Sequence, residues 1–110
     1  MNVPEFMDIV EEFRAHEEEL LAAKRAAYAG DADCLSNFKQ IAGILGLVPE
    51  QVCSVYLLKH ILGIAREVDA GGKAVWGDAA SEGLNQRISD ARNYLVLLAA
   101  IIRERDDDGQ

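Results

Sequence analysis

The chain has 110 residues, of which 50% are hydrophobic and 27% are charged, and its formal net charge at pH 7 is −8. This length allows one modest core and excludes two, so we expect a single domain. The acidic balance argues against a nucleic-acid-binding surface, because such surfaces gather Lys and Arg against the phosphate backbone. We also expect no membrane span, since no apolar run approaches about 20 residues.

The two cysteines, Cys34 and Cys53, lie in predicted helices among apolar neighbours and lack the spacing of metal ligands. We therefore expect both to be reduced thiols in the core. The N-terminus lacks the basic and then apolar build of a signal peptide, which indicates a cytoplasmic protein.

The first predicted helix covers residues 4–28 and carries two charges in its apolar stripe. It begins at Pro4, which suits a first helical turn, and stops at Gly30. At about 100° per residue, Glu17 and Lys24 share a stripe with the apolar side chains of Phe6, Ile9, Val10, Phe13, Leu20, Leu21, Ala27 and Tyr28. A lone buried charge is costly. The pattern therefore indicates a mutual ion pair, partners on other helices, or a wet cleft for a charged ligand.

Two further helices are predicted in the middle of the chain. The shorter covers about residues 33–45, between a cap at Asp31 or Asp33 and a stop at Gly46, and its expected buried side is Leu35, Phe38, Ala42 and Leu45. The longer covers residues 49–69 and carries a broad apolar arc of Leu57, Leu58, Ile61, Leu62, Ile64, Ala65 and Val68. Its opposite side holds Lys59, His60, Gly63, Arg66 and Glu67. That side predicts either an exposed charged stripe or a basic binding face, which Gly63 would let a neighbour or a ligand approach.

The link over residues 70–80 contains Trp76, which predicts an anchor to the core, a subunit contact or a stacking surface for a ligand. The fourth helix is predicted from Ser81 to about Arg105, with a core stripe of Leu84, Ile88, Ala91, Leu95, Leu98 and Ile102. Its border carries Arg87, Asp90 and Tyr94, either as a local ion pair beside a half-buried phenol or as the wall of a site. Residues 106–110 are expected to form a disordered acidic tail.

Together these elements predict an all-α, four-helix bundle-like single domain over residues 1–105, which assembles into homodimers or tetramers. Antiparallel packing of the bundle would bring the charges of the first and fourth helices, Glu17, Lys24, Arg87 and Asp90, into one cleft.

Three segments, residues 24–30 (KRAAYAG), 36–42 (SNFKQIA) and 59–98, resemble small helical proteins of the nucleotide-modification-associated family, many of which phages encode. Those proteins share a first helix with Lys that ends in Tyr and Gly, a mid-chain Lys or Arg face, and a late helix with Arg, Asp and Asn-Tyr. The family is similar in turn to the all-α nucleoside-triphosphate pyrophosphatases of the MazG-like fold. The resemblance implies an oligomeric helical bundle that binds a nucleotide through Mg²⁺.

In those pyrophosphatases, paired carboxylates on two helices hold Mg²⁺, a hard cation that prefers oxygen ligands. Asp90 matches the last acid of that pattern, but Arg87 stands where a Glu is expected, and Glu67 is the one acid near Lys59. The resemblance thus implies binding of a nucleotide or another phosphate ligand, with degenerate or no hydrolysis. On this hypothesis the metal ligands are Glu17, Asp90 and Glu67, with help from Glu82; the phosphate ligands are Lys24, Lys59, Arg66 and Arg87; and the base-stacking rings are Tyr28, Trp76 and Tyr94.

The alternative hypothesis is a non-enzymatic, homo-oligomeric interaction or structural module. In such a module Glu17 and Lys24 form a buried polar pair that fixes the register of the helices or of a subunit interface. A DNA-binding regulator is disfavoured, because Lys39 and Gln40 are the only good contact candidates in the second helix.

Overall fold

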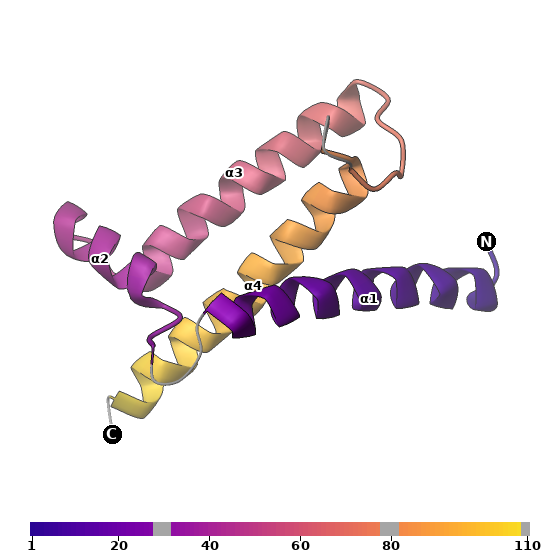
Figure 1. Ribbon diagram of the computed structural model, residues 1–110. Helices are drawn as coiled ribbons and strands as arrows, with labels where there is room; N and C mark the ends of the chain where they lie inside the picture. The colour runs from indigo at the N-terminus through magenta and orange to yellow at the C-terminus, as the bar shows by residue number, and fades with distance from the viewer. Residues whose placement is uncertain (28–31, 78–81, 109–110) are drawn as a thin grey trace. The chain divides into compact units, whose positions relative to one another are not determined.

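The computed structural model describes residues 1–27, 32–77 and 82–108, and these residues form four helices and no strand. The predicted all-α class with four helices is therefore confirmed. The chain divides into two compact units, Met1–Cys34 and Leu35–Gln110, which we call the N-terminal unit and the C-terminal unit. Helix α1 belongs to the first unit, and α2, α3 and α4 belong to the second (Figure 1). A four-helix bundle, a single domain and an oligomer stay predictions.

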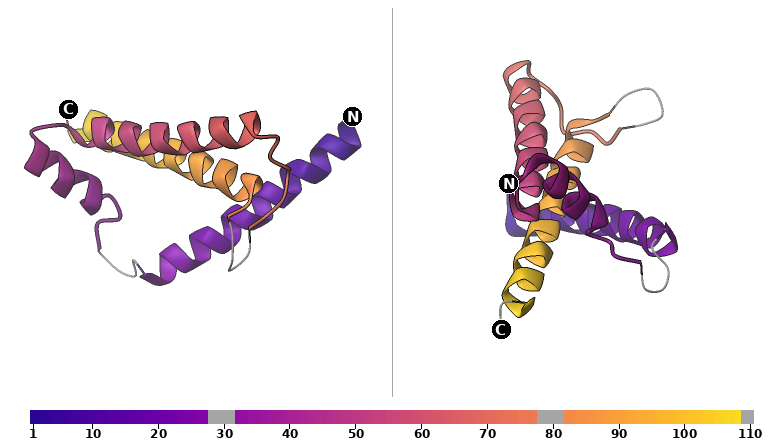
Figure 2. Two further views of the ribbon diagram at one scale, coloured as in Figure 1. Left: turned by 90° about the horizontal axis from the view of Figure 1, so that it is seen from above. Right: turned by 90° about the vertical axis from the view of Figure 1, so that its left-hand side faces the viewer.

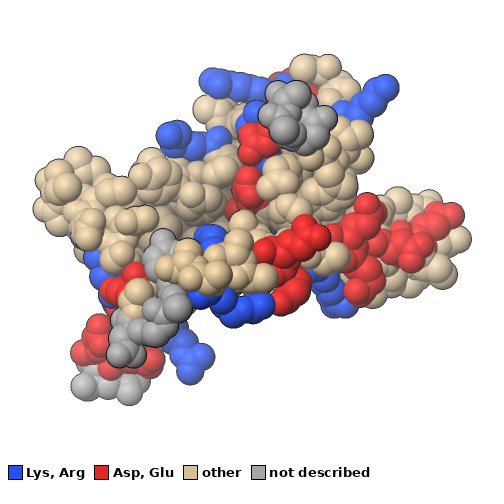
Figure 3. Space-filling view, viewed as in Figure 1, with Lys and Arg blue, Asp and Glu red and all other residues tan. Residues whose placement is uncertain are grey.

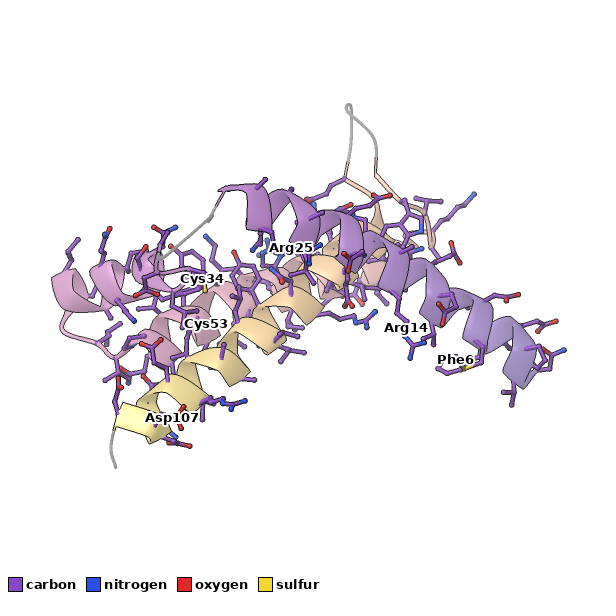
Figure 4. All side chains as sticks on the ribbon, turned by 60° about the horizontal axis from the view of Figure 1, so that its bottom comes forward. Phe6, Arg14, Arg25, Cys34, Cys53 and Asp107 are labelled. Atoms are coloured by element: carbon purple, nitrogen blue, oxygen red, sulfur yellow. The ribbon has the colours of Figure 1, made fainter. Side chains whose placement is uncertain are left out.

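Helix α1 (Val3–Ala27) begins with a reciprocal cap. The backbone N–H of Glu5 donates to Asn2 Oδ1 at 2.8 Å, and the backbone N–H of Asn2 donates to the Glu5 carboxylate at 3.0 Å. This pair satisfies amide groups that have no partner inside the helix. Acidic side chains follow the helix in Figure 3, and Phe6 and Arg14 project from it in Figure 4. The predicted stop at Gly30 lies outside the described residues.

Helix α2 (Ser36–Leu45) starts later than predicted. Its N-cap is Leu35, which makes no side-chain cap bond, so the predicted cap at Asp33 is wrong, and Asp31 lies outside the described residues. It ends as predicted at Gly46, whose φ of 69° is the left-handed conformation that glycine tolerates. Leu45 was expected in the core but is 61% exposed, because the helix ends there and the chain turns away.

Helices α3 (Pro49–Asp69) and α4 (Leu84–Asp108) lie side by side and run in opposite directions (Figures 1 and 2). The bounds of α3 are those predicted, and the predicted N-cap of α4, Ser81, lies outside the described residues. Helix α4 continues three residues past the predicted end at Arg105, so residues 106–108, part of the predicted acidic tail, are helical.

The core of the C-terminal unit lies where α2 meets α3 and the second half of α4. Its buried members are Leu35, Phe38, Ala42, Val52, Cys53 and Ile101. Cys53, labelled in Figure 4, is fully buried, and its Sγ lies 3.5 Å from the Tyr94 carbonyl oxygen to which it donates. The expectation of a core thiol is wrong for Cys34, which is exposed. Leu95, also expected in the core, is 53% exposed, because α4 turns Tyr94, Leu98 and Ile101 toward α3 instead.

The side of helix α3 that packs inside the C-terminal unit is not its most hydrophobic side. The side that packs against α2 and α4 carries Val52, Cys53 and Tyr56, and further along it carries His60, Gly63 and Glu67. Most of the apolar arc is exposed instead: Leu58 by 64%, Ile61 by 47%, Leu62 by 51% and Val68 by 59%. Val55, which lies outside the predicted arc, is exposed by 53%. Apolar and aromatic core packing and one close glycine contact hold the helix pair together, and five large aliphatic side chains of α3 face outward.

Candidate functional site

Four of the residues predicted for a site meet where the end of α3 lies beside the start of α4. Arg87 of α4 reaches across to α3, and its Nη1 lies 3.0 Å from the point that a Cβ atom on Gly63 would occupy. Its Nε lies 2.7 Å from Glu67 Oε1, and its Nη2 lies 3.6 Å from Glu82 Oε2. The neighbour that Gly63 admits is thus the guanidinium of Arg87.

The contact between Arg87 and Glu67 is an ion pair without a well-directed hydrogen bond. Arg87 Nε is buried, and the nearby carboxylate lies off the direction of its N–H, so this atom has no hydrogen-bond partner among the described residues. Burial makes a charged partner at this distance more valuable than it is at the surface. Glu67, predicted as a metal ligand, is therefore occupied by Arg87, and Arg87, predicted as a phosphate ligand, is balanced by two carboxylates.

Two other predicted phosphate ligands, Lys59 and Arg66, are exposed and lie on the same side of α3 as Gly63, one turn before it and one turn after it. Lys59 Nζ lies 5.9 Å from the centre of the Tyr56 ring, within the range of a cation–π contact. These two cations are the part of the predicted phosphate set that solvent reaches readily.

Tyr94, predicted to stack on a base, belongs to an aromatic cluster inside the C-terminal unit. Its ring centre lies 4.9 Å from that of His60, 6.1 Å from that of Tyr56 and 6.4 Å from that of Phe38. Burial, and then the nearby Tyr56, Asp90 and Cys53, raise the pKa of the Tyr94 phenol. Tyr94 therefore serves the packing of α3 against α4 and is held in its neutral form.

Asp90, predicted as a metal ligand, accepts a hydrogen bond from Gln86 Nε2 at 3.2 Å, one turn earlier in α4. Trp76 is half-buried in the link, where the Val75 carbonyl accepts a hydrogen bond from the Asn85 N–H at 3.0 Å. Gly83 is required there, since a Cβ atom would lie 2.2 Å from the Val75 oxygen. The link thus closes directly onto the start of α4.

The remaining predicted residues belong to the N-terminal unit or lie outside the described ranges. Glu17 and Lys24 are half-buried residues of α1, and Tyr28 lies outside the described residues. Convergence of Glu17 and Lys24 with Arg87 and Asp90 stays a prediction, as does the Mg²⁺ set of Glu17, Asp90 and Glu67. In the ranges that the structure describes, no group of three or more His, Cys, Asp or Glu side chains could hold a metal ion.

A groove that sequence patterns did not reveal lies at the opposite end of the α3–α4 pair. It has a volume of about 530 Å³ and an apolar floor that includes Leu35 and Ile101. Two ion pairs border it, Lys39 Nζ to Glu104 Oε1 at 2.5 Å and Arg105 Nη1 to Glu50 Oε2 at 3.2 Å. Each pair joins α4 to a different helix, so spacing within one helix carries no signal for it.

The apolar side of α3 that faces away from α4 is exposed, and we call it the α3 face and define it as Val55, Leu58, Ile61, Leu62, Ala65 and Val68. Charged side chains are sparse over α2 and the first part of α3 in Figure 3. Patches of this kind on soluble proteins mark interaction sites, whereas single exposed apolar residues carry no such meaning.

In the described residues no single helix is long and apolar enough to cross a membrane, whereas α2 and α3, bent by 103° at their junction, reach the required length and hydropathy only as a pair. Comparison of the chain with protein-family models, with curated proteins and with solved structures gives no match.

Proposed function

We propose that this chain is a helical interaction module that self-associates through the α3 face. The observation that carries the proposal is that the most hydrophobic side of α3 faces away from the C-terminal unit. Its aromatic and polar side is used inside the C-terminal unit, and five large aliphatic side chains are left between 47% and 64% exposed. Because each such side chain gains about 1.5–3 kcal/mol on full burial, leaving all five in water is unfavourable.

A second copy is the occupant that matches the apolar character of the α3 face. The net charge of −8 disfavours anionic membranes and nucleic acids, and it also makes two copies repel each other, so the attraction between copies has to come from this uncharged face. The α3 face itself contains no charged residue, and each copy presents the same apolar surface to the other.

The size of the face predicts weak association. Together with the aliphatic stems of Lys59 and Arg66, it offers on the order of 500 Å² per copy, so two copies bury on the order of 1,000 Å². Interfaces of this size belong to transient complexes rather than to permanent ones. The association is therefore expected to be reversible and to depend on protein concentration.

The test compares two substitutions that introduce a negative charge, by light scattering after size-exclusion chromatography. Leu58→Glu places a carboxylate in the middle of the α3 face and is expected to give a monomer at every concentration. Val96→Glu is the matched control, because Val96 of α4 is equally exposed, at 66%, but lies outside the α3 face. Equal masses for the wild type and Leu58→Glu at all concentrations, or equal loss of mass in both variants, would contradict the proposal.

A second candidate function is the binding of a phosphate-bearing ligand, such as a nucleoside triphosphate with Mg²⁺. The exposure of Lys59 and Arg66 on one side of α3, next to the Arg87 guanidinium, supports it, as does the resemblance to MazG-like pyrophosphatases. A ligand that binds only the folded chain raises the melting temperature. We expect this rise to be lost in Arg66→Ala and kept in Arg103→Ala, a distant exposed arginine. No rise at millimolar nucleotide would contradict this candidate.

A further inference from the structure

We propose that the partner of the α3 face is the α3 helix of a second copy, packed antiparallel to the first. This inference rests on the proposed self-association and adds to it the contacting element and its direction. Val55, Leu58, Leu62 and Ala65 follow one another at intervals of three, four and three residues. This spacing forms the seam of a two-helix coiled coil, in which alternate seam residues insert between those of the facing helix.

The residues that border the seam differ between its two sides. On one side they are apolar and widen the apolar contact. Ile61 and Val68 border the seam on one side, so the apolar surface continues past the seam there. Lys59 and Arg66 border it on the other side. The ammonium group of Lys59 lies near the Tyr56 ring, on the side of α3 that packs inside its own unit, so it is drawn away from the seam.

The ends of the seam select the antiparallel direction. The same spacing continues to Gln51 at the start of α3 and to Asp69 at its end. Parallel packing would set Asp69 against the same residue of the other copy, two carboxylates in one layer, which is unfavourable. Antiparallel packing sets Asp69 against Gln51 of the other copy. Because Gln51 Oε1 already accepts from the Val48 N–H at 3.0 Å, its amide nitrogen is the group left to donate to that carboxylate.

The sizes of the seam residues agree with this direction. In antiparallel packing the layers pair Leu58 with Leu62 of the other copy and Val55 with Ala65 of the other copy, so every layer contains at least one branched side chain. In parallel packing Ala65 would face Ala65, which leaves a thin layer near one end. The antiparallel arrangement also sets the dipoles of the two helices against each other favourably.

The test uses cysteine cross-linking in a Cys34→Ser background, which removes the exposed native thiol and keeps the buried Cys53. Val55→Cys and Ala65→Cys are prepared separately, and one of them carries a small tag so that mixed dimers differ in size. Both substitutions keep the two leucines of the seam. Each variant alone, and an equal mixture, are oxidised in a glutathione buffer and separated on a non-reducing gel, since a disulfide requires Cα atoms within about 7 Å.

Antiparallel packing predicts a cross-linked dimer in the mixture that exceeds either variant alone by more than tenfold. Cross-linking of each variant with itself would overturn the proposed direction in favour of parallel packing. If the reduced variants sediment as dimers but no mixture cross-links, the copies associate through another surface and the α3 pairing is wrong. If the reduced variants and the wild type are monomers at all concentrations, the proposed self-association fails as well.

Discussion

Arg87 Nη1 lies 3.0 Å from the position at which a Cβ atom on Gly63 would begin. The absence of a side chain at position 63 allows α4 to extend this arginine over α3, toward the carboxylate of Glu67. The same close approach turns the other side of α3, with its aliphatic residues, away from the unit. This one contact therefore connects the local packing with the surface that we propose as an interface.

The first prediction concerns the two helical glycines, Gly43 and Gly63. Gly43→Ala in α2 meets nothing within 4 Å, so it should stabilise the fold by about 0.5–1 kcal/mol through helix propensity. Gly63→Ala gains the same propensity but must displace Arg87, which Glu67 and Glu82 hold in place. We expect its gain to be smaller by at least about 0.5 kcal/mol, measured by urea unfolding. Equal gains would show that Arg87 moves aside freely.

The second prediction separates the two carboxylates around Arg87. Glu67→Gln removes the charge 2.7 Å from the buried Arg87 Nε, whereas Glu82→Gln removes a more exposed charge, 3.6 Å from Arg87 Nη2. We expect a loss of about 1 kcal/mol in the free energy of unfolding for Glu67→Gln and less than about 0.5 kcal/mol for Glu82→Gln. A larger loss for Glu82→Gln would contradict this ranking.

The third prediction concerns the dependence of stability on pH. Burial raises the pKa of the Cys53 thiol, and burial together with Tyr56, Asp90 and Cys53 raises the pKa of the Tyr94 phenol. Below about pH 8.5 both groups are protonated in the folded and unfolded chain, so their contribution is fully present. At higher pH the unfolded chain releases these protons first, and the free energy of unfolding falls.

Chemical denaturation between pH 8 and pH 11 checks this direction. In Tyr94→Phe the phenol no longer titrates, so the fall near about pH 10, the ordinary pKa of tyrosine, should be less steep than in the wild type. Identical slopes in the two proteins would mean that Tyr94 is not protected from ionisation.

The fourth prediction uses the contrast between the two thiols. Cys34 is exposed and Cys53 is fully buried, so a thiol reagent should modify Cys34 within minutes and Cys53 only after the C-terminal unit opens. Cys34→Ser should then show the slow phase alone. Rapid modification of both thiols in the native protein would contradict the burial of Cys53 of α3 against α2 and α4.

Local sequence signals predict where the helices begin and end more accurately than they predict which sides of the helices pack together. Pro49 and Gly46 mark helix ends through fixed backbone preferences, and the structure places α3 and the end of α2 where these residues indicate. The start of α2 differs, because the cap position is filled by Leu35, whose side chain is drawn into the core rather than to the helix end.

The packed side of α3 could not be predicted from hydrophobicity, because much of the contact with α4 depends on aromatic, glycine and charged groups that are far apart in sequence. Tyr56 and Tyr94 stack across the two helices, and Gly63 makes room for Arg87. Likewise, the ion pair between Arg105 and Glu50 joins residues far apart in the chain. Periodicity finds which side chains share a face of one helix, and it does not show which face another helix covers.

Sedimentation velocity of the wild-type chain across a concentration series is the most direct test of the interaction module. Self-association through the α3 face predicts a weight-average mass that rises from the monomer value of 12.0 kDa toward twice that value, and a return to the monomer in Leu58→Glu. A mass of 12.0 kDa that stays constant up to millimolar protein would contradict it.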